Sequence, residues 1–585
     1  MPGRWRSATT QERSAVDATR QPVSNSGTGH PVSRRKIAVV GALLVSAALA
    51  GGSLAWFVVL RPAGATPTAA LDAPKFVEES AAAGIAQVYS GNASYALGGG
   101  VAVFDCSGDR KPDVYVAGGD GPAALYRNDS PVGGALKFTK LTDPATDLTN
   151  VEGAYPIDID GDGKVDLMVL RYGESVILRG LGGCRFERAN EAWSFAGGDD
   201  WASAFSATWE GSATWPTMAL GHYVTRDASG APTTMCATNS FFRPNSGGTG
   251  FGPPATLAPG YCSLSMLFSD WDGSGRRDLR IANDRNYYTD GTDQLWRIAQ
   301  GEQPRVYTDA DGWVSLQVNG MGLASYDVTG DGHPDIYITS QGDNKLQTLT
   351  AGPGQPTYRD IALKRGVTAA RPFTGGDVYP STSWHPEFQD VNNDGFIDLF
   401  ISKGNVDAQP DYAVKDPNDL FLGQPDGTFK EAADTAGILN YARGRGAALA
   451  DFNLDGMLDL VEVNYRDGVK LWRNVGSGDA ARPAQMGNWL AIRTSETGAN
   501  RNAIGAWIEV KAGSSTMRRE LTIGGGHAGG QLGWTHIGIG PAGTVQVRIQ
   551  WPDGQFGPWM DVAANQFVDI ERGASQARPW SPSQT

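Results

Sequence analysis

The sequence predicts an all-β protein: a seven-bladed β-propeller, followed by a small β-sandwich domain and preceded by one N-terminal transmembrane helix. Three observations support this prediction. An aspartate-rich segment recurs along the chain, an uncharged apolar run stands near the N-terminus, and the composition of 77 Gly, 33 Pro and 19% charged residues is typical of many strands and tight turns. A chain of 585 residues exceeds one ordinary core, so we expect several modules.

The N-terminal region predicts a membrane anchor. Residues 37–60 (IAVVGALLVSAALAGGSLAWFVVL) contain no ionisable side chain, and about 20 apolar residues suffice to cross a bilayer as a helix. Arg34, Arg35 and Lys36 precede this run, so the positive-inside rule places residues 1–36, a disordered basic tail, in the cytoplasm. We therefore expect a single-pass protein of the cell membrane whose bulk is extracytoplasmic, joined to the anchor by a linker over 61–72. The alternative is a secreted protein, released by signal cleavage near Ala63–Ala65.

Four cysteines fit an oxidising compartment. Cys236 and Cys262 bracket a Gly- and Pro-rich loop that a disulfide would staple, so we predict that they pair. Cys106 and Cys184 then pair by elimination, or remain two buried thiols.

A nine-residue pattern recurs six times, each time followed by a short β-like run. The copies are DCSGDRKPD at Asp105, DIDGDGKVD at Asp158, DWDGSGRRD at Asp270, DVTGDGHPD at Asp327, DVNNDGFID at Asp390 and DFNLDGMLD at Asp451. The spacing from 158 to 270 is nearly twice the others, and TWEGSATWP at 208–216 supplies a degenerate copy there. Seven copies at intervals of about 50–60 residues suit a propeller of four-stranded blades over 73–480, rather than an open solenoid, because ring closure protects the strand edges.

Each loop predicts a calcium site. Oxygen side chains stand at positions 1, 3, 5 and 9, and Ca²⁺ takes about 6–8 oxygen ligands. An EF-hand would need Glu at position 12 and flanking helices, which this pattern lacks; solvated Asp-Gly turns are the alternative without metal. Up to about six Ca²⁺ ions are expected, with the following ligands: Asp105, Ser107, Asp109, Asp113; Asp158, Asp160, Asp162, Asp166; Asp270, Asp272, Ser274, Asp278; Asp327, Thr329, Asp331, Asp335; Asp390, Asn392, Asp394, Asp398; Asp451, Asn453, Asp455, Asp459.

In the degenerate copy the oxygen-ligand positions fall on Thr208, Glu210, Ser212 and Pro216, so we expect no metal there. The C-terminal part, 487–572, alternates as strands do and predicts the β-sandwich, with a disordered tail over 573–585. Residues 524–529 match G-x-G-x-x-G, but no helix follows, so a nucleotide site is not expected.

These motifs resemble a known family. The DxDxDGxxD loops with their following strands resemble FG-GAP/VCBS repeats, and Asn502–Ala506, Arg519-Glu520, Gly524–Gly526 and Trp551–Gly554 look like an ASPIC/UnbV domain. The combination resembles the cartilage acidic protein family, as a bacterial-type member. The resemblance covers roughly residues 74–572 and implies the same propeller followed by an ASPIC/UnbV domain.

The sequence contains none of the local catalytic motifs that announce hydrolases, P-loop enzymes or kinases, so no catalytic residue or organic cofactor is predicted. A net charge of −14 argues against nucleic acid as a partner. The preferred interpretation is a calcium-binding protein for adhesion to, or recognition of, an extracellular polysaccharide or protein, with the loops around Asp284 and His385 as candidates for contact. The alternatives are an enzyme, such as a lyase, isomerase or cyclase acting on a carbohydrate or natural product at one propeller face, and a structural envelope component that senses calcium.

Overall fold

The computed structural model describes residues 65–284 and 291–583. Pro62–Thr585 group into one compact unit, and the following concerns that unit. Strands dominate it, which confirms the prediction of an all-β fold. The helices of the described residues are single turns: α1 (Ser80–Ala83), α2 (Ala362–Arg365), α3 (Ala433–Ala436) and the 3₁₀ turns η1 (Ala93–Tyr95) and η2 (Asp309–Asp311).

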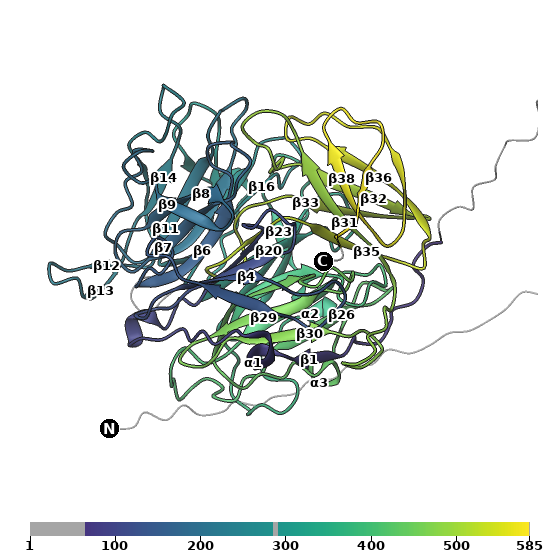
Figure 1. The fold of residues 1–585 in the computed structure, drawn as a ribbon. Coiled ribbons are helices and arrows are strands. Elements are labelled where there is room, and N and C mark those ends of the chain that lie inside the picture. Colours follow the sequence, from purple (N-terminus) through teal and green to yellow (C-terminus); the bar gives the residue numbers. More distant parts are fainter. Residues whose placement is uncertain (1–64, 285–290, 584–585) are drawn as a thin grey trace, which may run out of the picture. The chain divides into compact units, whose positions relative to one another are not determined.

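Seven sheets of this unit follow one another along the chain, and each is built on four antiparallel strands (Figure 1); the first sheet also takes up β34 (Gln531–Leu532) as a fifth, parallel strand. Sheet 1 contains β2 (Val101–Phe104), β3 (Asp113–Val116), β4 (Ala124–Asn128) and β5 (Phe138–Leu141). Sheet 2 contains β6 (Val151–Ile157), β7 (Asp166–Arg171), β8 (Val176–Gly182) and β9 (Arg185–Arg188). Sheet 3 contains β10 (Ala202–Thr208), β11 (Thr217–His222), β14 (Asn239–Phe242) and β15 (Ala255–Leu257). A ribbon of β12 (Val224–Arg226) and β13 (Pro232–Cys236) is inserted in sheet 3.

Sheets 4 to 7 repeat the arrangement. Sheet 4 contains β16 (Ser263–Ser269), β17 (Asp278–Asn283), β18 (Gln294–Arg297) and β19 (Arg305–Val306), and sheet 5 contains β20 (Gly320–Tyr326), β21 (Asp335–Ser340), β22 (Lys345–Leu349) and β23 (Tyr358–Asp360). Sheet 6 contains β24 (Ser383–Gln389), β25 (Asp398–Lys403), β26 (Asp419–Gly423) and β27 (Phe429–Glu431). Sheet 7 contains β28 (Gly444–Ala450), β29 (Asp459–Asn464), β30 (Lys470–Asn474) and the N-terminal strand β1 (Phe76–Glu78).

The sheets close into a ring. The first strand of each sheet packs against the first strand of the next, and β28 packs against β2 of sheet 1. The N-terminal strand β1 completes the last sheet by pairing with β30, with Phe76 opposite Asn474. This pairing ties the two ends of the ring together, so each sheet has a neighbour on both faces. The first and second strands are accordingly buried along nearly their whole length rather than alternating between buried and exposed.

The C-terminal domain consists of two further four-stranded sheets, drawn in green to yellow in Figure 1. Their inner faces share an apolar core that includes Leu490, Val510, Val547 and Ile570. One sheet is β35 (Thr535–Gly540), β31 (Asn488–Ser495), β38 (Gln566–Glu571), β39 (Arg578–Trp580), and the other is β33 (Ser515–Glu520), β32 (Trp507–Ala512), β36 (Thr544–Gln550), β37 (Met560–Ala563).

The structure corrects one prediction about the N-terminal region and one about the C-terminal tail. In residues 65–284 and 291–583, no helix is long and apolar enough to cross a membrane, so the predicted single-pass anchor is not supported; the run 37–60 that carried the prediction lies outside the described residues. The tail predicted as disordered, 573–585, contains β39, which pairs with β38 and places Trp580 against Phe567. The contact between the Trp580 and Phe567 rings explains why this short strand is held.

Both cysteine pairs form disulfides, Cys236 with Cys262 and Cys106 with Cys184. The first is the predicted pair, and it closes the ribbon β12–β13 onto the start of β16. The second joins sheet 1 to the turn between β8 and β9 of sheet 2, which removes the alternative of two free thiols.

Candidate metal centres and the centre of the ring

The six acidic loops, the nine-residue segments that begin at Asp105, Asp158, Asp270, Asp327, Asp390 and Asp451, share one geometry. Each connects the first strand of a sheet to the second, and its ninth residue opens the second strand. Ile157 before the Asp158 loop pairs with Asp166, and Gln389 before the Asp390 loop pairs with Asp398. Positions 1 to 8 thus form a closed turn, and the aspartate at position 9 is fixed by the sheet at the base of that turn.

The aspartate at position 9 is buried and joins the loop to the third strand of its sheet. In the Asp158 loop, Oδ2 of Asp166 accepts a hydrogen bond of 2.8 Å from the Ile159 amide, and Oδ1 accepts one of 2.7 Å from the Gly180 amide. Asp113, Asp398 and Asp459 make the same pair of bonds. Each carboxylate oxygen has a second lone pair, so these bonds leave acceptor capacity for a cation.

The Asp158 loop gathers carboxylates most closely. Oxygens of Asp158, Asp160 and Asp166 lie within 4.8 Å of one another. Asp158 is 4% exposed, its Oδ2 accepts from the Gly163 amide, and its Oδ1 has no hydrogen-bond partner among the described residues. An unpartnered buried carboxylate oxygen is costly unless a cation or water satisfies it. The residues present therefore fit a hard divalent cation.

The electrostatics of this loop agree with that fit. Burial raises the pKa of Asp158 to about 6 and that of Asp166 to about 8, with the neighbouring carboxylates adding to the shift. The outer carboxylates already have positive partners, because Arg179 pairs with Asp160 at 2.9 Å and Lys164 with Asp162 at 2.9 Å. Both cations are substantially exposed, so they can turn to solvent when an ion takes their place.

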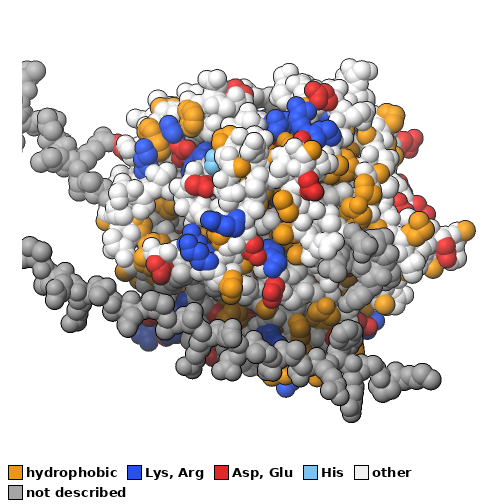
Figure 2. All heavy atoms as spheres, turned by 180° about the vertical axis from the view of Figure 1, so that it is seen from behind, with side chains coloured by type: hydrophobic (Ala, Val, Ile, Leu, Met, Phe, Trp, Pro, Cys, Tyr) orange, Lys and Arg blue, Asp and Glu red, His pale blue; other side chains and the backbone are white. Residues whose placement is uncertain are grey.

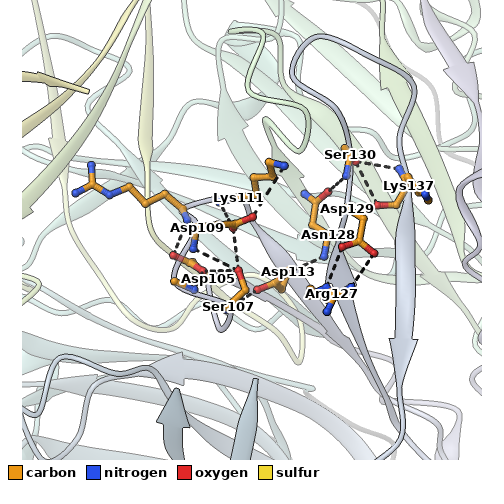
Figure 3. A network of polar contacts seen from close by, with 12 residues as sticks. Asp105, Ser107, Asp109, Lys111, Asp113, Arg127, Asn128, Asp129, Ser130 and Lys137 are labelled. Carbon is orange, nitrogen blue, oxygen red and sulfur yellow. Dashed lines mark hydrogen bonds and ion pairs between the residues drawn. The ribbon is translucent and has the colours of Figure 1, made fainter. Parts of the chain in front are cut away.

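The Asp105 and Asp270 loops are different. In Figure 3 the Ser107 hydroxyl lies between Asp105 and Asp109, at 3.2 and 2.9 Å, and bridges carboxylates that a metal would otherwise share. In the Asp270 loop, Arg276 binds both oxygens of Asp278 at 2.9 and 3.0 Å, although Oδ1 of Asp270 has no partner among the described residues. The protein's own hydroxyl and guanidinium groups thus compete with a cation in these two loops.

A third group of metal-ligating side chains brings Cys106 and Asp113 of the Asp105 loop close to Cys184. The two sulfurs form a disulfide and cannot supply thiolate ligands. Of these three residues only Asp113 can therefore serve as a metal ligand.

The Asp390 and Asp451 loops are the most buried. Asp390, Asp394 and Asp398 are at most 5% exposed, and burial raises the pKa of Asp390 and Asp398 well above the usual range, with mutual repulsion adding to it. The same causes act on Asp451 and Asp459. The Asp327 loop is more open, and burial raises the pKa of Asp335 there to about 6. Concentrated buried carboxylates of this kind are stabilised by a divalent cation, which displaces their protons.

The degenerate loop lies one residue later than the sequence predicted. Thr208 still belongs to the strand β10 and pairs with Thr217, which opens β11. The turn is therefore 209–216, and its positions 1, 3, 5 and 9 are Trp209, Gly211, Ala213 and Thr217 instead of Thr208, Glu210, Ser212 and Pro216. The pattern search aligned the wrong residues because only the strand register defines position 9. Glu210 is held by Arg243 at 2.7 Å.

The C-terminal domain lies on the acidic loops, which the sequence did not reveal. Arg110 pairs with Asp569 at 3.0 Å, and His536 bonds to Asn393 at 2.6 Å. Further contacts reach the other loops: Arg501 to Gly161 O, Arg277 to Gly505 O, Arg518 to Gly332 O and the Trp489 ring beside Gly456. The six candidate sites therefore lie at the interface between the ring and the C-terminal domain.

The central segment, residues 523–532, enters the middle of the ring. Gly524, Gly525 and Gly526 have φ of 127°, 71° and 55°, a backbone path that favours glycine. The segment hydrogen-bonds to the first strands of sheets 1 to 6 and ends in β34 (Gln531–Leu532), which pairs with β2 in parallel. Gly446 of β28 lies against His527 O. The stretch that matches G-x-G-x-x-G therefore closes the centre of the ring.

His385 and Asp284, the candidate contact residues, are both buried. Nδ1 of His385 accepts from the His527 amide at 3.1 Å, so Nε2 carries the proton and faces Glu387 Oε2 at 3.4 Å. Oδ2 of Asp284 accepts from the Tyr223 hydroxyl at 2.7 Å. His385 thus contacts the central segment. Asp284 follows the last residue of β17, at the end of that strand opposite to its acidic loop. Residues 285–290 lie outside the described part.

Comparison with known proteins identifies two kinds of module. The model "ASPIC and UnbV" matches residues 496–577, and the model "FG-GAP-like repeat" matches 105–169 and 390–462. Cartilage acidic protein 1 of Mus musculus is 29% identical over 241 residues, covering 38% of this chain and 34% of the relative. The protein of Homo sapiens is 29% identical over 238 residues, covering 38% and 33%. The match thus spans about a third of the length of these curated relatives.

Similar solved structures include BBS1N in complex with ARL6DN, with a TM-score of 0.38 and 10% identity, covering 68% of this chain and 96% of that chain. Sqt1 of Saccharomyces cerevisiae also has a TM-score of 0.38, with 13% identity over 69% of this chain and 100% of that chain. At these TM-scores the likeness carries no argument about function.

Proposed function

We propose that this chain, which carries FG-GAP-like repeats and an ASPIC/UnbV domain and is a distant homologue of cartilage acidic protein 1, is a calcium-stabilised extracellular recognition protein. The seven sheets act as blades of a seven-bladed β-propeller over about 73–480, and the sandwich over about 487–572 is held on its acidic loops. The opposite face binds an extracellular polysaccharide or protein.

The unpartnered Oδ1 of Asp158 is the observation that carries the calcium proposal. It lies in a cluster of three carboxylates whose all-oxygen donor set suits Ca²⁺ better than a softer metal. Asp158, Asp160, Asp162 and Asp166 would hold the ion. The five other acidic loops would bind Ca²⁺ with affinities that depend on the protein groups competing for their carboxylates. The affinity would be lowest at the Asp270 loop, because Arg276 already binds Asp278.

Calcium would stabilise the contact between the domains. The C-terminal domain contacts the acidic loops, so carboxylates that repel one another inside a loop also loosen the surface on which this domain rests. Neutralising them with a divalent ion would fix the loop backbone that Arg501 and Arg518 contact through Gly161 and Gly332. The ion would then be structural, and would not itself bridge to a partner.

Two disulfides support an extracellular place of action, since such bonds persist in oxidising compartments. A surface for recognition is available on the face opposite the acidic loops. The connections there expose large apolar side chains, and exposed apolar groups in one area mark interaction sites. They are Phe373, Val378, Tyr379, Val414 and Tyr441, the apolar patch. The amides of Val414 and Lys415 donate to Asp377, which joins the first two segments, and the Tyr441 hydroxyl lies beside Gly375.

The distribution of charged side chains on one face supports a partner that is not recognised mainly through charge. On the face in Figure 2, acidic, basic and apolar side chains are interspersed, without a broad field of one sign. Recognition through apolar contacts and hydrogen bonds fits such a surface better than recognition of a polyanion.

The calcium proposal is tested by titrating Ca²⁺ into the chelated full chain by calorimetry, and by recording its melting temperature with and without EDTA. A ligand at 100 times its Kd stabilises the native state by about 2.7 kcal/mol per site. Asp158→Asn should remove one site, whereas Asp426→Asn, in the exposed turn between β26 and β27, should remove none. Equal melting with and without EDTA, and no binding heat, would refute calcium binding.

Partner recognition is tested separately, by capture of purified envelope polysaccharides and proteins with the calcium-loaded chain. A double variant, Tyr379→Ser with Val414→Ser, should reduce capture at least tenfold without changing the melting temperature, because both side chains are more than half exposed. Met235→Ser, on the exposed ribbon β12–β13, is the control. Unchanged capture by the double variant would exclude the apolar patch.

A further inference from the structure

A polar cavity of about 190 Å³ lies beside the central segment, between strand β24 and the C-terminal domain. Its lining includes Ser325, His385, Glu387 and Gln389 from the ring, with Arg519 and Gln531 from the C-terminal part. A dry cavity of about 150 Å³ is large enough to hold benzene. This cavity can therefore take a small organic molecule.

The ring side of the cavity is an ordered polar network in which Glu387 is fully engaged. Its Oε1 accepts from Gln389 and Gln531, both at 2.8 Å, and its Oε2 accepts from the Leu449 amide at 3.1 Å. His385 Nε2 adds a fourth donor at 3.4 Å. Four donors hold this carboxylate in place, so it cannot turn toward a positive group across the cavity.

Arg519 faces this network without a carboxylate of its own. Its Nη1 donates to Gln389 Oε1 at 2.8 Å, and among the described residues no carboxylate lies within ion-pair distance of it; the Glu387 charge acts on it only from farther away. The other arginine of the lining, Arg493, pairs with Asp569 at 3.0 Å. A guanidinium has five donors, and a partly buried one with a single protein acceptor leaves most of its fork unused.

The neighbouring charges restrict the ligand. A guanidinium fork binds carboxylate and phosphate equally well by geometry. However, Glu387 and Glu520 also line the cavity, and both are at least nine-tenths buried. Burial raises the pKa of Glu520 to about 7, so this group is only partly charged near neutral pH. Glu387 and the charged fraction of Glu520 repel a dianion more strongly than a monoanion, because the repulsion scales with the charge product.

We propose that this cavity binds the carboxylate of a small monocarboxylic acid, with Arg519 as a bidentate anchor and Gln389 fixing the orientation of its guanidinium. The inference is independent of calcium, since no residue of the acidic loops takes part. It assigns to the closed centre of the ring a ligand site separate from the apolar patch.

The test measures binding of propionate and benzoate to the full chain by saturation-transfer NMR and calorimetry. The neutral amides propionamide and benzamide, and inorganic phosphate at the same ionic strength, serve as comparison ligands. We expect the carboxylates to bind, the amides not to bind, and phosphate to bind at least tenfold more weakly. Binding of the amides as well as the acids, or of phosphate in preference to them, would overturn the assignment.

Two adjacent arginines provide matched variants. Arg519→Gln should weaken carboxylate binding about tenfold or more, the value of a charged hydrogen bond, whereas Arg518→Gln should leave it unchanged. Arg518 pairs with Glu509 at 3.0 Å and does not line the cavity. Equal binding by wild type and Arg519→Gln would refute the anchor.

A measurement on the wild-type chain does not depend on how the variants fold. Phenylglyoxal modifies free guanidinium groups, and mass spectrometry follows each arginine separately. Benzoate should slow modification of Arg519 at least fivefold and leave that of Arg518 unchanged. An unchanged rate at Arg519 would contradict the proposal.

Discussion

Substituting Gly153 by alanine tests whether the central segment is held in the ring by close backbone contact. Gly153 lies on β6, and a Cβ there would be 1.8 Å from Ala528 O, far inside van der Waals contact. Strand β6 is flanked by β2 and β10 and paired with β7, so the central segment has to move. This movement breaks the 3.1 Å hydrogen bond from the Ala154 amide to Ala528 O.

The magnitude follows from these two losses. Overpacking costs about 1–3 kcal/mol and the broken hydrogen bond about 1 kcal/mol, so we expect a loss of about 2–4 kcal/mol. At about 2.1 cal/mol/K per residue, the roughly 520 residues of the compact unit give an unfolding entropy near 1.1 kcal/mol/K. The melting temperature should therefore fall by about 2–4 °C.

Hydrogen exchange locates the effect. In Gly153→Ala the amides of 523–532 should lose protection, whereas amides of β36 in the C-terminal core should keep theirs. Gly543→Ala is the control, because a Cβ there meets no atom within 4 Å. Wild-type protection of 523–532 in Gly153→Ala, with an unchanged melting temperature, would refute the claim that the segment is locked in the ring.

Two further predictions concern buried charges. Burial raises the pKa of Glu152 to about 8, so between about pH 4.5 and 8 the folded state holds a proton that the unfolded state has released, and the free energy of unfolding falls as pH rises. Glu152→Gln should reduce the pH dependence of the free energy of unfolding by up to about 1.4 kcal/mol per pH unit. Urea unfolding at pH 5, 6.5 and 8 measures this dependence in both proteins, and an identical dependence in the two would disprove the prediction. Lys403, fully buried, pairs with Asp416 and Asp419 at 3.2 and 3.1 Å, so Lys403→Met should cost about 3–5 kcal/mol by leaving two buried carboxylates unpaired. When both aspartates are also changed to Asn, the melting temperature should rise again. If it does not, the loss of stability in Lys403→Met comes from lost packing rather than from unpaired carboxylates.

Much of the strand arrangement could be predicted from the sequence, because it repeats locally. Each aspartate at position 9 opens a strand, as the run DLMVLR after Val165 already indicated. The spacing of the repeats also indicated the hidden third copy, since β10 and β11 stand where a hairpin was expected. Its register was misjudged by one residue, because Thr208 looks like a loop ligand in the sequence and only pairing with Thr217 shows that it belongs to the strand.

The contacts between distant segments could not be predicted. Nothing in the letters GGGHAGG indicates that His527 lies fully buried beside Trp384, 143 residues earlier in the chain, because this contact depends on closure of the ring. The same holds for Arg519, which looks like an ordinary charged residue of an exposed strand until the docked domain places it over Gln389. The anchor prediction was made from the uncharged run 37–60 and the basic residues before it, and it is corrected because no helix of the described residues is long and apolar enough to cross a membrane.

The sequence by itself determined the all-β class, the acidic loops and the strands that follow them, because turn chemistry and strand pattern are properties of neighbouring residues. Only the tertiary structure decided that the loops lie beneath the C-terminal domain, that residues 523–532 close the ring, and that Arg519 lines a cavity without an ion-pair partner among the described residues. These features depend on which surfaces meet when two separately patterned domains pack, and packing joins residues that no local pattern connects.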